Sequence, residues 1–576
     1  MTSSASRVRP SSSENPEDIR TMTGTQLQFK IMRLGVDPTQ VVGKPAPGPV
    51  DRRTIEMRGM VVEYDTAVPM RDGVRIYVDV YRPHQSSGAA PILLAWGPYG
   101  KHWLTNQMYP GSGVDPAWIS DLTAFEAPDP IYWTSHGYAV VVADPRGLWN
   151  SEGDFSHNGP QEREDLYDTI EWLAARPWSS GNVGMLGVSY LAGSQYQAAS
   201  AAPPSLKAIS PWECFSDWYR EFATHGGIPE TGFRPRVSTN VSYSRGRTED
   251  PAANMWAHPF DDWYYAEKYG AIDQITIPTY MVASWGDHGL HTRGTLNAFD
   301  QIGSTDKWLE VHGQKKWMYF YHPDSVERQR QFFDTYLKGM EVGLEHWPRV
   351  SAEIRDNGRS DDSIWKNFDD AKFSTDVFPL YLDLSAMALE PSAVAPQSSE
   401  SFDATNDSIS LEYTFDRETD IVGPASLTLW LAADHSTDAD VFVILRKFDP
   451  AGAEVAFPTG SIFSDGPVAL GWLRASHRET DDQSTPLVPH HPHTNEEPLV
   501  PGDPVRLDIE IWASGTVFHA GETLRLTIQG RDFQKRVTES GVPPLQILHE
   551  SLRNDGTWTV LSGGSFESVL RLPRSP

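Results

Sequence analysis

Short apolar runs and amphipathic segments alternate through the first half of the chain. Three runs are brief and almost wholly apolar, which is typical of parallel strands buried on both faces: residues 91–96 (PILLAW), 138–143 (YAVVVA) and 183–186 (VGML). Residues 161–175 repeat apolar side chains at helical spacing, and residues 190–201 also predict a helix. This β–α–β order predicts a mainly parallel sheet covered by helices on both faces.

Residues 212–272 interrupt this pattern. The segment is rich in aromatic side chains and shows no clear strand, so we expect a helical insertion. The parallel pattern resumes at residues 278–283 (PTYMVA) and 307–311 (KWLEV), and residues 325–338 predict a closing helix.

Both ends of the chain differ from this α/β region. Residues 1–18 are polar and predict disorder, whereas residues 22–35 predict a short helix. After about residue 346, apolar and polar residues alternate, as in residues 507–511 and 524–528. Such alternation is typical of antiparallel strands with one buried face, so we expect the C-terminal half to be a β-sandwich.

Composition narrows the classes of function. A chain of 576 residues is expected to form two or three domains. It carries 48 basic and 77 acidic residues, and its net charge of −29 repels nucleic-acid phosphates and anionic lipid, so we expect neither as a partner. Cys214 is the single cysteine, which excludes an intramolecular disulfide. No apolar run suits a signal peptide or a membrane span, and we expect a cytoplasmic protein.

Residues 187–193 (GVSYLAG) follow a predicted strand and open a predicted helix. A nucleophilic serine needs such a tight strand-to-helix turn because the turn pushes its Oγ out of the sheet. Gly187 leaves room for the crowded backbone, although Leu191 replaces the glycine usual two positions after the serine. We therefore predict Ser189 as a nucleophile, with a serine at an ordinary strand-to-helix turn as the alternative.

Several motifs together resemble the cocaine-esterase-like and X-prolyl dipeptidyl-peptidase-like serine hydrolases. In chain order they are residues 68–74 (VPMRDGV), 97–99 (GPY), 143–147 (ADPRG), 187–191 (GVSYL) and 285–287 (WGD). The resemblance covers about residues 58–572 and implies an α/β-hydrolase fold followed by an all-β jelly roll. The expected parts are a partly disordered extension (1–57), an α/β-hydrolase domain (58–211 and 273–345), a helical cap (212–272) and a jelly-roll domain (346–576).

The resemblance also implies roles for three more residues. Asp287 follows the strand expected at 278–283 and is the expected acid of a Ser–His–Asp triad. The backbone N–H of Tyr190 and the hydroxyl of Tyr99 are expected to bind the oxyanion. The alternatives are an aspartate that caps a loop and a tyrosine that only packs its ring.

The sequence leaves the catalytic base open. The family places its histidine a few residues into the loop after the last parallel strand, where this chain has Lys315 or Lys316, and His312 lies slightly earlier. His312 could act through a shifted loop, or Lys315 could act as a desolvated, neutral amine. His288 or His291, beside the predicted acid, could also substitute. Loss of hydrolytic chemistry is the fourth alternative.

The leading functional prediction is an acyl hydrolase that cleaves carboxylic esters or amides through an acyl-enzyme on Ser189. Aromatic side chains of the insertion are expected to cover the substrate: Trp212, Phe215 and Trp218. An X-prolyl-type aminopeptidase is a second hypothesis, and it needs acidic groups for the substrate's amino terminus. The candidates are Glu213, Asp217 and Glu221, unless they are simply solvated. A non-hydrolytic or binding protein that retains the pocket is the third hypothesis.

Other features add no chemistry. Phosphate-binding and zinc motifs do not occur, so we expect no cofactor and no metal. His490, His491 and His493 form a cluster, for which a solvated loop is favoured over a metal site. Arg146 is expected to tie down a loop by charge-assisted hydrogen bonds. The expected partner is a small-molecule ester or amide, and assembly into a homo-oligomer is left open.

Overall fold

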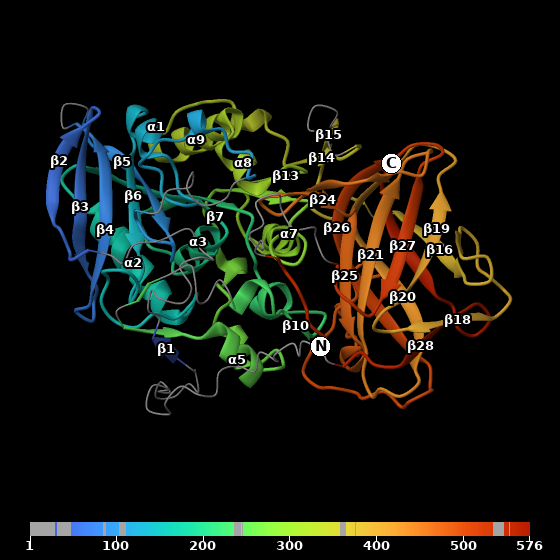
Figure 1. The fold of residues 1–576 in the computed structure, drawn as a ribbon. Coiled ribbons are helices and arrows are strands. Elements are labelled where there is room, and N and C mark those ends of the chain that lie inside the picture. Colours follow the sequence, from blue (N-terminus) through green and yellow to red (C-terminus); the bar gives the residue numbers. More distant parts are fainter. Residues whose placement is uncertain are drawn as a thin grey trace, which may run out of the picture.

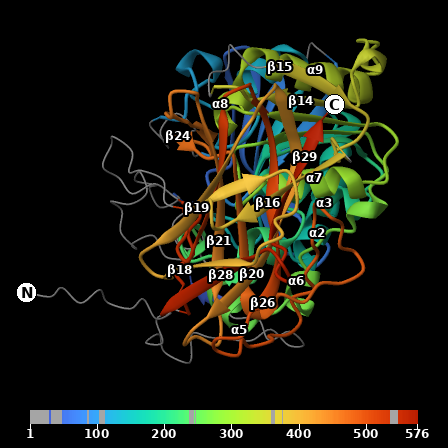
Figure 2. The ribbon, with the colours of Figure 1, turned by 90° about the vertical axis from the view of Figure 1, so that its right-hand side faces the viewer.

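The computed structural model describes residues 29–31, 48–84, 88–102, 111–235, 243–244, 246–357, 364–374, 376–533, 546–551 and 553–575. An 11-stranded, mainly parallel sheet and a 12-stranded, mainly antiparallel sheet lie next to each other (Figure 1). In the view turned by 90°, strands of the second sheet stand in front of the first (Figure 2). The predicted order of an α/β domain followed by an all-β domain is confirmed.

The first sheet has the strand order β15-β14-β13-β12-β8-β7-β5-β6-β4-β3-β2. Its parallel part consists of β5 (Ala90–Trp96), β6 (Ala139–Asp144), β7 (Ser179–Val188), β8 (Leu206–Trp212), β12 (Thr279–Ser284), β13 (Lys307–His312) and β14 (Val350–Ile354). Antiparallel strands extend both edges: β2 (Arg53–Met57), β3 (Met60–Pro69), β4 (Arg75–Pro83) and β15 (Ile364–Phe368). All of the apolar runs predicted as buried strands lie in the parallel part.

Helices cover both faces of this sheet. Ile92 and Leu94 of β5 share a core with α2 (Pro160–Ala174), α3 (Tyr190–Ser200) and α7 (Thr292–Gln301). Leu93, between them, belongs to the opposite core, which it shares with α1 (Pro130–Ser135), α8 (Lys316–Tyr321) and α9 (Pro323–Lys338). Because successive side chains of a strand point to opposite faces, a strand covered on both sides must be apolar throughout.

Within residues 212–235, 243–244 and 246–272, which the structure describes, the expected helical insertion consists of short helices and short strands. They include a π-helix (Tyr219–Ala223), α5 (Pro251–Ala257), α6 (Trp263–Ala266) and the strands β9 (Thr224–His225), β10 (Ile228–Pro229) and β11 (Arg247–Glu249). The strand β11 pairs with β1 (Phe29–Ile31), so the helix predicted over residues 22–35 is wrong at β1. Strands this short carry no readable period, which is why the sequence did not predict them.

The second sheet forms the C-terminal half. Its strands are β16 (Asp376–Asp383), β17 (Ala388–Glu390), β18 (Ser398–Asp403), β19 (Ser408–Thr414), β20 (Thr419–Ala433), β21 (Asp440–Phe448), β22 (Glu454–Val455), β25 (Ala469–Arg474), β26 (Val505–Phe518), β27 (Thr523–Gln529), β28 (Thr557–Ser562) and β29 (Val569–Ser575). Alternate residues of β26 and β27, among them Leu507, Ile509 and Leu526, form its buried core, as predicted. A small hairpin of β23 (Phe457–Thr459) and β24 (Phe463–Gly466) joins no larger sheet.

The two halves meet beside α7. Arg293 of α7 pairs with Glu510 of β26, with 2.9 Å between Nε and Oε1. His288, which follows β12, has its Nε2 2.9 Å from the carbonyl of Ala513 in β26. Within the described residues, no helix is long and apolar enough to cross a membrane.

Candidate active site

Ser189 lies at the sharp turn between β7 and α3. Its backbone has φ 60° and ψ −118°, a conformation that is rare for a residue with a side chain. Its N–H donates to the carbonyls of Trp212 and Glu213, at 3.0 and 3.1 Å, so the strained turn is held by the segment after β8. Gly187 has φ 156°, and a Cβ there would come within 2.5 Å of the Leu191 side chain. The turn therefore has the geometry that exposes a nucleophilic hydroxyl.

His291 contacts the hydroxyl of Ser189. The distance between Ser189 Oγ and His291 Nε2 is 3.1 Å, and Nδ1 of the same ring bonds to Oδ2 of Asp287. Asp287 follows β12 at the carboxyl edge of the parallel sheet, and its carbonyl accepts the N–H of His291 at 3.1 Å. The acid and the imidazole are thus one turn apart at the start of α7, and both side chains are buried.

His312 and Lys315, the bases predicted first from the sequence, do not contact the hydroxyl of Ser189. His312 uses both ring nitrogens elsewhere: Nδ1 accepts the N–H of Gln314 at 3.1 Å, and Nε2 lies 3.1 Å from Glu213 Oε1. Lys315 turns away, and its Nζ donates to the carbonyl of Gly111 at 3.0 Å. The prediction that His312 or Lys315 contacts Ser189 is wrong, because His312 at the end of β13 bonds to Glu213 and Gln314, and Lys315 in the loop after it bonds to Gly111.

The remaining residues weighed as the base are His288 and Lys316. His288 Nε2 lies 2.9 Å from the carbonyl of Ala513 and faces the C-terminal sheet. Lys316 is buried, and its Nζ lies 2.8 Å from Asp287 Oδ2 and 2.9 Å from His291 Nδ1. Of the residues weighed as bases, His291 has the contact that a base needs, and the lysine at the usual histidine position contacts the acid.

The charges around this cluster fix the protonation states. Burial and the nearby Lys316 ammonium lower the pKa of His291 to about 4, so the imidazole is neutral at pH 7. Burial opposes ionisation of Asp287, but Lys316 and His291 hold the pKa of this carboxyl well below its usual range. Burial also opposes the charge on Lys316, yet the carboxyls of Asp287, Glu213 and Glu126 raise its pKa. A neutral imidazole between a hydroxyl and a carboxylate is the state required of a general base.

Groups that could bind an oxyanion lie on both sides of Ser189. The N–H of Tyr190 is the first of α3, and no described acceptor binds it. The Tyr190 hydroxyl points elsewhere and donates to Glu162 at 2.8 Å. The Tyr99 ring packs edge-on against Phe125, and its hydroxyl bonds to the carboxyl of Glu126. Burial raises the pKa of Glu126 to about 8 despite Lys316 nearby.

The predicted substrate aromatics divide into two groups. Trp212 is fully buried against Tyr280 and Phe320 within the core, so its ring is not at the catalytic cluster. Phe215 stacks beside His291 with 6.2 Å between ring centroids, and Trp218 packs on Phe215 at 5.4 Å.

The acidic residues of the insertion are not solvated. Glu221 is buried and pairs with Arg293 at 2.7 Å, and Asp217 pairs with Arg220 at 2.8 Å. Glu213 is fully buried beside His312. Each of these carboxyls therefore already has a partner within the protein.

Two remaining predictions have clear outcomes. Arg146 donates to Asp165 at 2.7 and 2.6 Å and to Asp72 at 2.8 Å, which confirms its loop-tying role. The histidine cluster lies in a loop, but the expectation that it is solvated is wrong. His491 is 6% exposed and His493 4% exposed.

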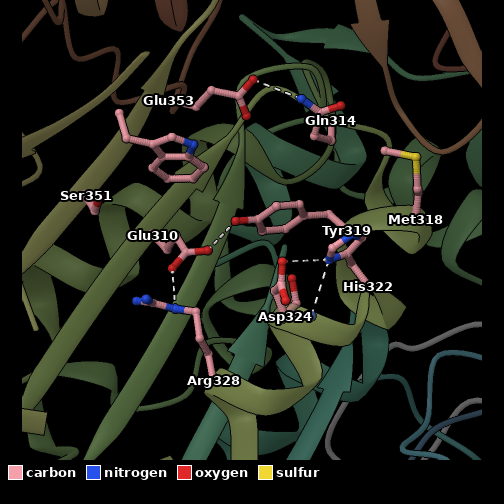
Figure 3. A pocket seen from close by; sticks show the side chains of 11 residues that line it. Glu310, Gln314, Met318, Tyr319, His322, Asp324, Arg328, Ser351 and Glu353 are labelled. Atoms are coloured by element: carbon pink, nitrogen blue, oxygen red, sulfur yellow. Dashed lines mark hydrogen bonds and ion pairs between the residues drawn. The ribbon is translucent and has the colours of Figure 1, made fainter. Parts of the chain in front are cut away.

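A cavity of about 450 Å³ lies behind the loop that follows β13 (Figure 3). Gln314 and Tyr319 form part of its wall, and both also contact His312, the latter by ring stacking at 4.0 Å. Glu310 binds Arg328 at 2.9 Å in this cavity, and Glu353 accepts the Gln314 amide at 2.9 Å. None of Ser189, His291 and Asp287 lines it, so this cavity is separate from the catalytic cluster.

Comparisons with known proteins agree with this geometry. The family model described as X-Pro dipeptidyl-peptidase (S15 family) matches residues 72–258, and the model of the X-Pro dipeptidyl-peptidase C-terminal non-catalytic domain matches residues 343–571. A cocaine esterase from a Rhodococcus species is 40% identical over 198 residues, which span 33% of this chain and 31% of the esterase. A putative Xaa-Pro dipeptidyl-peptidase from Bacillus anthracis is 23% identical over 84% of both chains.

Solved structures extend the likeness to nearly the whole chain. An α-amino acid ester hydrolase superposes with a TM-score of 0.68 at 17% identity, which shows a shared fold. A CocE/NonD family hydrolase from Staphylococcus aureus superposes with a TM-score of 0.84 at 36% identity. That match covers 89% of this chain and 94% of the Staphylococcus protein. With its strand–serine–helix turn and both halves matched, this chain belongs to the CocE/NonD family of serine hydrolases.

Proposed function

We propose that the protein hydrolyses carboxylic esters through an acyl-enzyme on Ser189, with His291 as the base and Asp287 as the acid. The observation that carries this proposal is the continuous contact from the Ser189 hydroxyl to His291 Nε2, at 3.1 Å, and from His291 Nδ1 to Asp287. These contacts allow the proton of the Ser189 hydroxyl to pass to His291 Nε2 during attack on a carbonyl carbon, while Asp287 holds the ring.

The reaction follows from these positions. Ser189 Oγ attacks the ester carbonyl while His291 Nε2 takes its proton, and Asp287 stabilises the imidazolium that forms. The N–H of Tyr190 and the hydroxyl of Tyr99 stabilise the oxyanion. His291 then gives the proton to the leaving alcohol, and a water molecule activated by the same imidazole releases the acid.

Ester hydrolysis is favoured over the removal of X-Pro dipeptides. A dipeptidyl-peptidase needs carboxylates that are free to bind the substrate's ammonium group. The three acidic candidates of the insertion are each engaged with a cation or a histidine of the protein. Phe215, whose ring stacks beside that of His291, suits an apolar acyl or alcohol group instead.

The test measures hydrolysis of p-nitrophenyl and naphthyl esters and of an X-Pro p-nitroanilide. Wild type is compared with Ser189→Ala, His291→Ala and His312→Ala, and a fluorophosphonate probe reports the nucleophile. We expect ester hydrolysis and labelling to be lost in Ser189→Ala, and hydrolysis to be lost in His291→Ala but not in His312→Ala. Full turnover by Ser189→Ala would overturn the mechanism, and a preference for the anilide would favour the peptidase.

A further inference from the structure

Glu213 joins the nucleophile turn to the predicted acid. It follows β8 with φ 46°, a left-handed conformation that costs free energy for a residue with a side chain. Its N–H donates to the carbonyl of Val282 at 2.7 Å, and its own carbonyl accepts the N–H of Ser189 at 3.1 Å. These bonds fix the strained backbone, and a fully buried carboxyl oxygen of Glu213 lies within 4.8 Å of one of Asp287.

The hydrogen bonds around Glu213 can be followed donor by donor. Burial lowers the pKa of His312 to about 4, so its ring is neutral at pH 7, and because the N–H of Gln314 donates to Nδ1, the ring proton must be on Nε2. That Nε2–H then donates to Glu213 Oε1 at 3.1 Å. No described residue donates to the other oxygen, Oε2, although the carboxyl is fully buried. A carboxyl oxygen of Glu213 lies within 4.8 Å of one of Asp287, and two carboxyl groups can share a hydrogen bond only if one of them carries a proton.

We propose that Glu213 is a protonated carboxylic acid whose Oε2–H donates a hydrogen bond to Asp287 and so positions the acid of the triad. The inference rests on the proposed function, because it gives Glu213 a positioning role for the Ser189–His291–Asp287 reaction. Glu213 does not touch the substrate in this scheme. It holds the carboxylate of Asp287 in the orientation that receives the Nδ1–H of His291.

The balance of charge supports this protonation state. Lys316 contributes one ammonium to a buried cluster that also holds the carboxyls of Asp287, Glu213 and Glu126. One ammonium balances one carboxylate, and Asp287, at 2.8 Å, is the carboxylate it contacts. Further ionisation would leave buried negative charge without a partner. Burial accordingly raises the pKa of Glu213 well above its ordinary value, and Asp287 raises it further.

The same arrangement gives the site an alkaline limit. When Glu213 ionises, the hydrogen bond is lost and two carboxylates repel one another. The titratable groups that face Glu213 are Asp287 and His291 from the β12–α7 segment, His312 and Lys316 from the β13–α8 segment, and Glu126. Activity should therefore fall at alkaline pH as Glu213 loses its proton. A side chain at this position that cannot ionise should remove the alkaline limb of the pH profile.

Glu213→Gln tests the proposal because an amide keeps both hydrogen bonds. Its carbonyl can accept from His312 and its N–H can donate to Asp287. We expect kcat to stay within about threefold of wild type at neutral pH and the alkaline limb assigned to Glu213 to disappear. Glu213→Ala removes the donor, and kcat should fall about 10- to 100-fold with little change in KM. A fall of that size in Glu213→Gln, where the donor remains, would overturn the proposal.

Infrared difference spectroscopy measures the proton itself and needs no activity. Wild type minus Glu213→Gln should show the C=O stretch of a protonated carboxylic acid. The matched control is Glu249→Gln, since Glu249 is equally buried but pairs with Lys268 at 2.8 Å, which helps to lower its pKa to about 2 against the effect of burial. The spectrum of wild type minus Glu249→Gln should show the bands of an ionised carboxylate instead. A carboxylate signal from Glu213 would refute the proposal, whereas inactivity of wild type on esters with an acid signal would refute only the proposed function.

Discussion

Lys316 should set the acid limit of catalysis, and its removal offers a sensitive test of the proposed base. The ammonium lies 2.9 Å from His291 Nδ1 and favours the neutral ring. Burial and Lys316 together lower the pKa of His291 from 6.5 to about 4, which corresponds to about 3 kcal/mol. Wild type should therefore keep its full kcat/KM down to about pH 5, where an unperturbed histidine would already be protonated.

Lys316→Met removes the charge and keeps much of the side chain's volume. A nearby like charge typically shifts a pKa by about one to three units, so the acid midpoint of kcat/KM should rise by about that amount toward pH 6.5. At pH 5 the variant should then be about 2- to 30-fold slower relative to its own plateau. The assay is kcat/KM for a p-nitrophenyl ester from pH 4 to pH 8, with naphthol release as a second readout at low pH.

Lys315→Met is the matched control for this experiment. Lys315 is adjacent in sequence, but its ammonium donates to the carbonyl of Gly111 and makes no contact with His291. We expect its acid midpoint to equal that of wild type. The reasoning fails if Lys316→Met, shown to be folded by its thermal melt, keeps the wild-type midpoint. It also fails if the wild-type midpoint already lies near pH 6.5.

Four further outcomes follow from the described contacts. Replacing His291 by Asn should lower kcat about 10⁴-fold, while His312→Asn should cost less than about tenfold, as measured by ester hydrolysis. Tyr99→Phe should lower kcat about 10²- to 10³-fold with little change in KM if its hydroxyl binds the oxyanion; equal rates would exclude that role. Arg146→Met should leave kcat unchanged but cost about 3 kcal/mol in urea unfolding, because the buried Asp165 loses its partner. The Glu126 carboxyl ionises near pH 4.5 when unfolded but near pH 8 when folded, so stability should fall as pH rises between these values, and Glu126→Gln should flatten that slope.

The elements that could be predicted from sequence are those whose pattern is long enough to carry a period. Strand β5 is apolar at every position because both of its faces are covered, and this alone identified a parallel strand. Residues 187–193 predicted the strand–serine–helix turn because Gly187 relieves a contact that no larger residue tolerates. The pairing of β1 with β11 could not be predicted, because two three-residue strands far apart in sequence have no local signal.

The base was harder to predict than the nucleophile for a physical reason. Its position depends on where the chain leaves the sheet, and His312, the last residue of β13, is buried against Glu213 rather than presented to Ser189. The available signal was the spacing of Asp287 and His291, four residues apart in the turn that leads into α7. That spacing lets both side chains lie one turn apart on the same face, where they can meet.

This spacing also explains how a lysine can lie in the loop that usually supplies the histidine. When the acid and the base both belong to the segment that opens α7, their mutual geometry no longer depends on the loop after β13. That loop can then place Lys316 against Asp287, at 2.8 Å, where it balances the negative charge. As a consequence His291 is a base of low pKa, since the Lys316 ammonium disfavours the imidazolium that forms during attack. An enzyme so arranged should hydrolyse activated esters, with good leaving groups, far better than amides, because a weak base gives less help to the attacking hydroxyl. The ratio of kcat/KM for a p-nitrophenyl ester to that for the matching anilide should therefore fall in Lys316→Met at pH 8, and an unchanged ratio would show that the lysine does not limit the base.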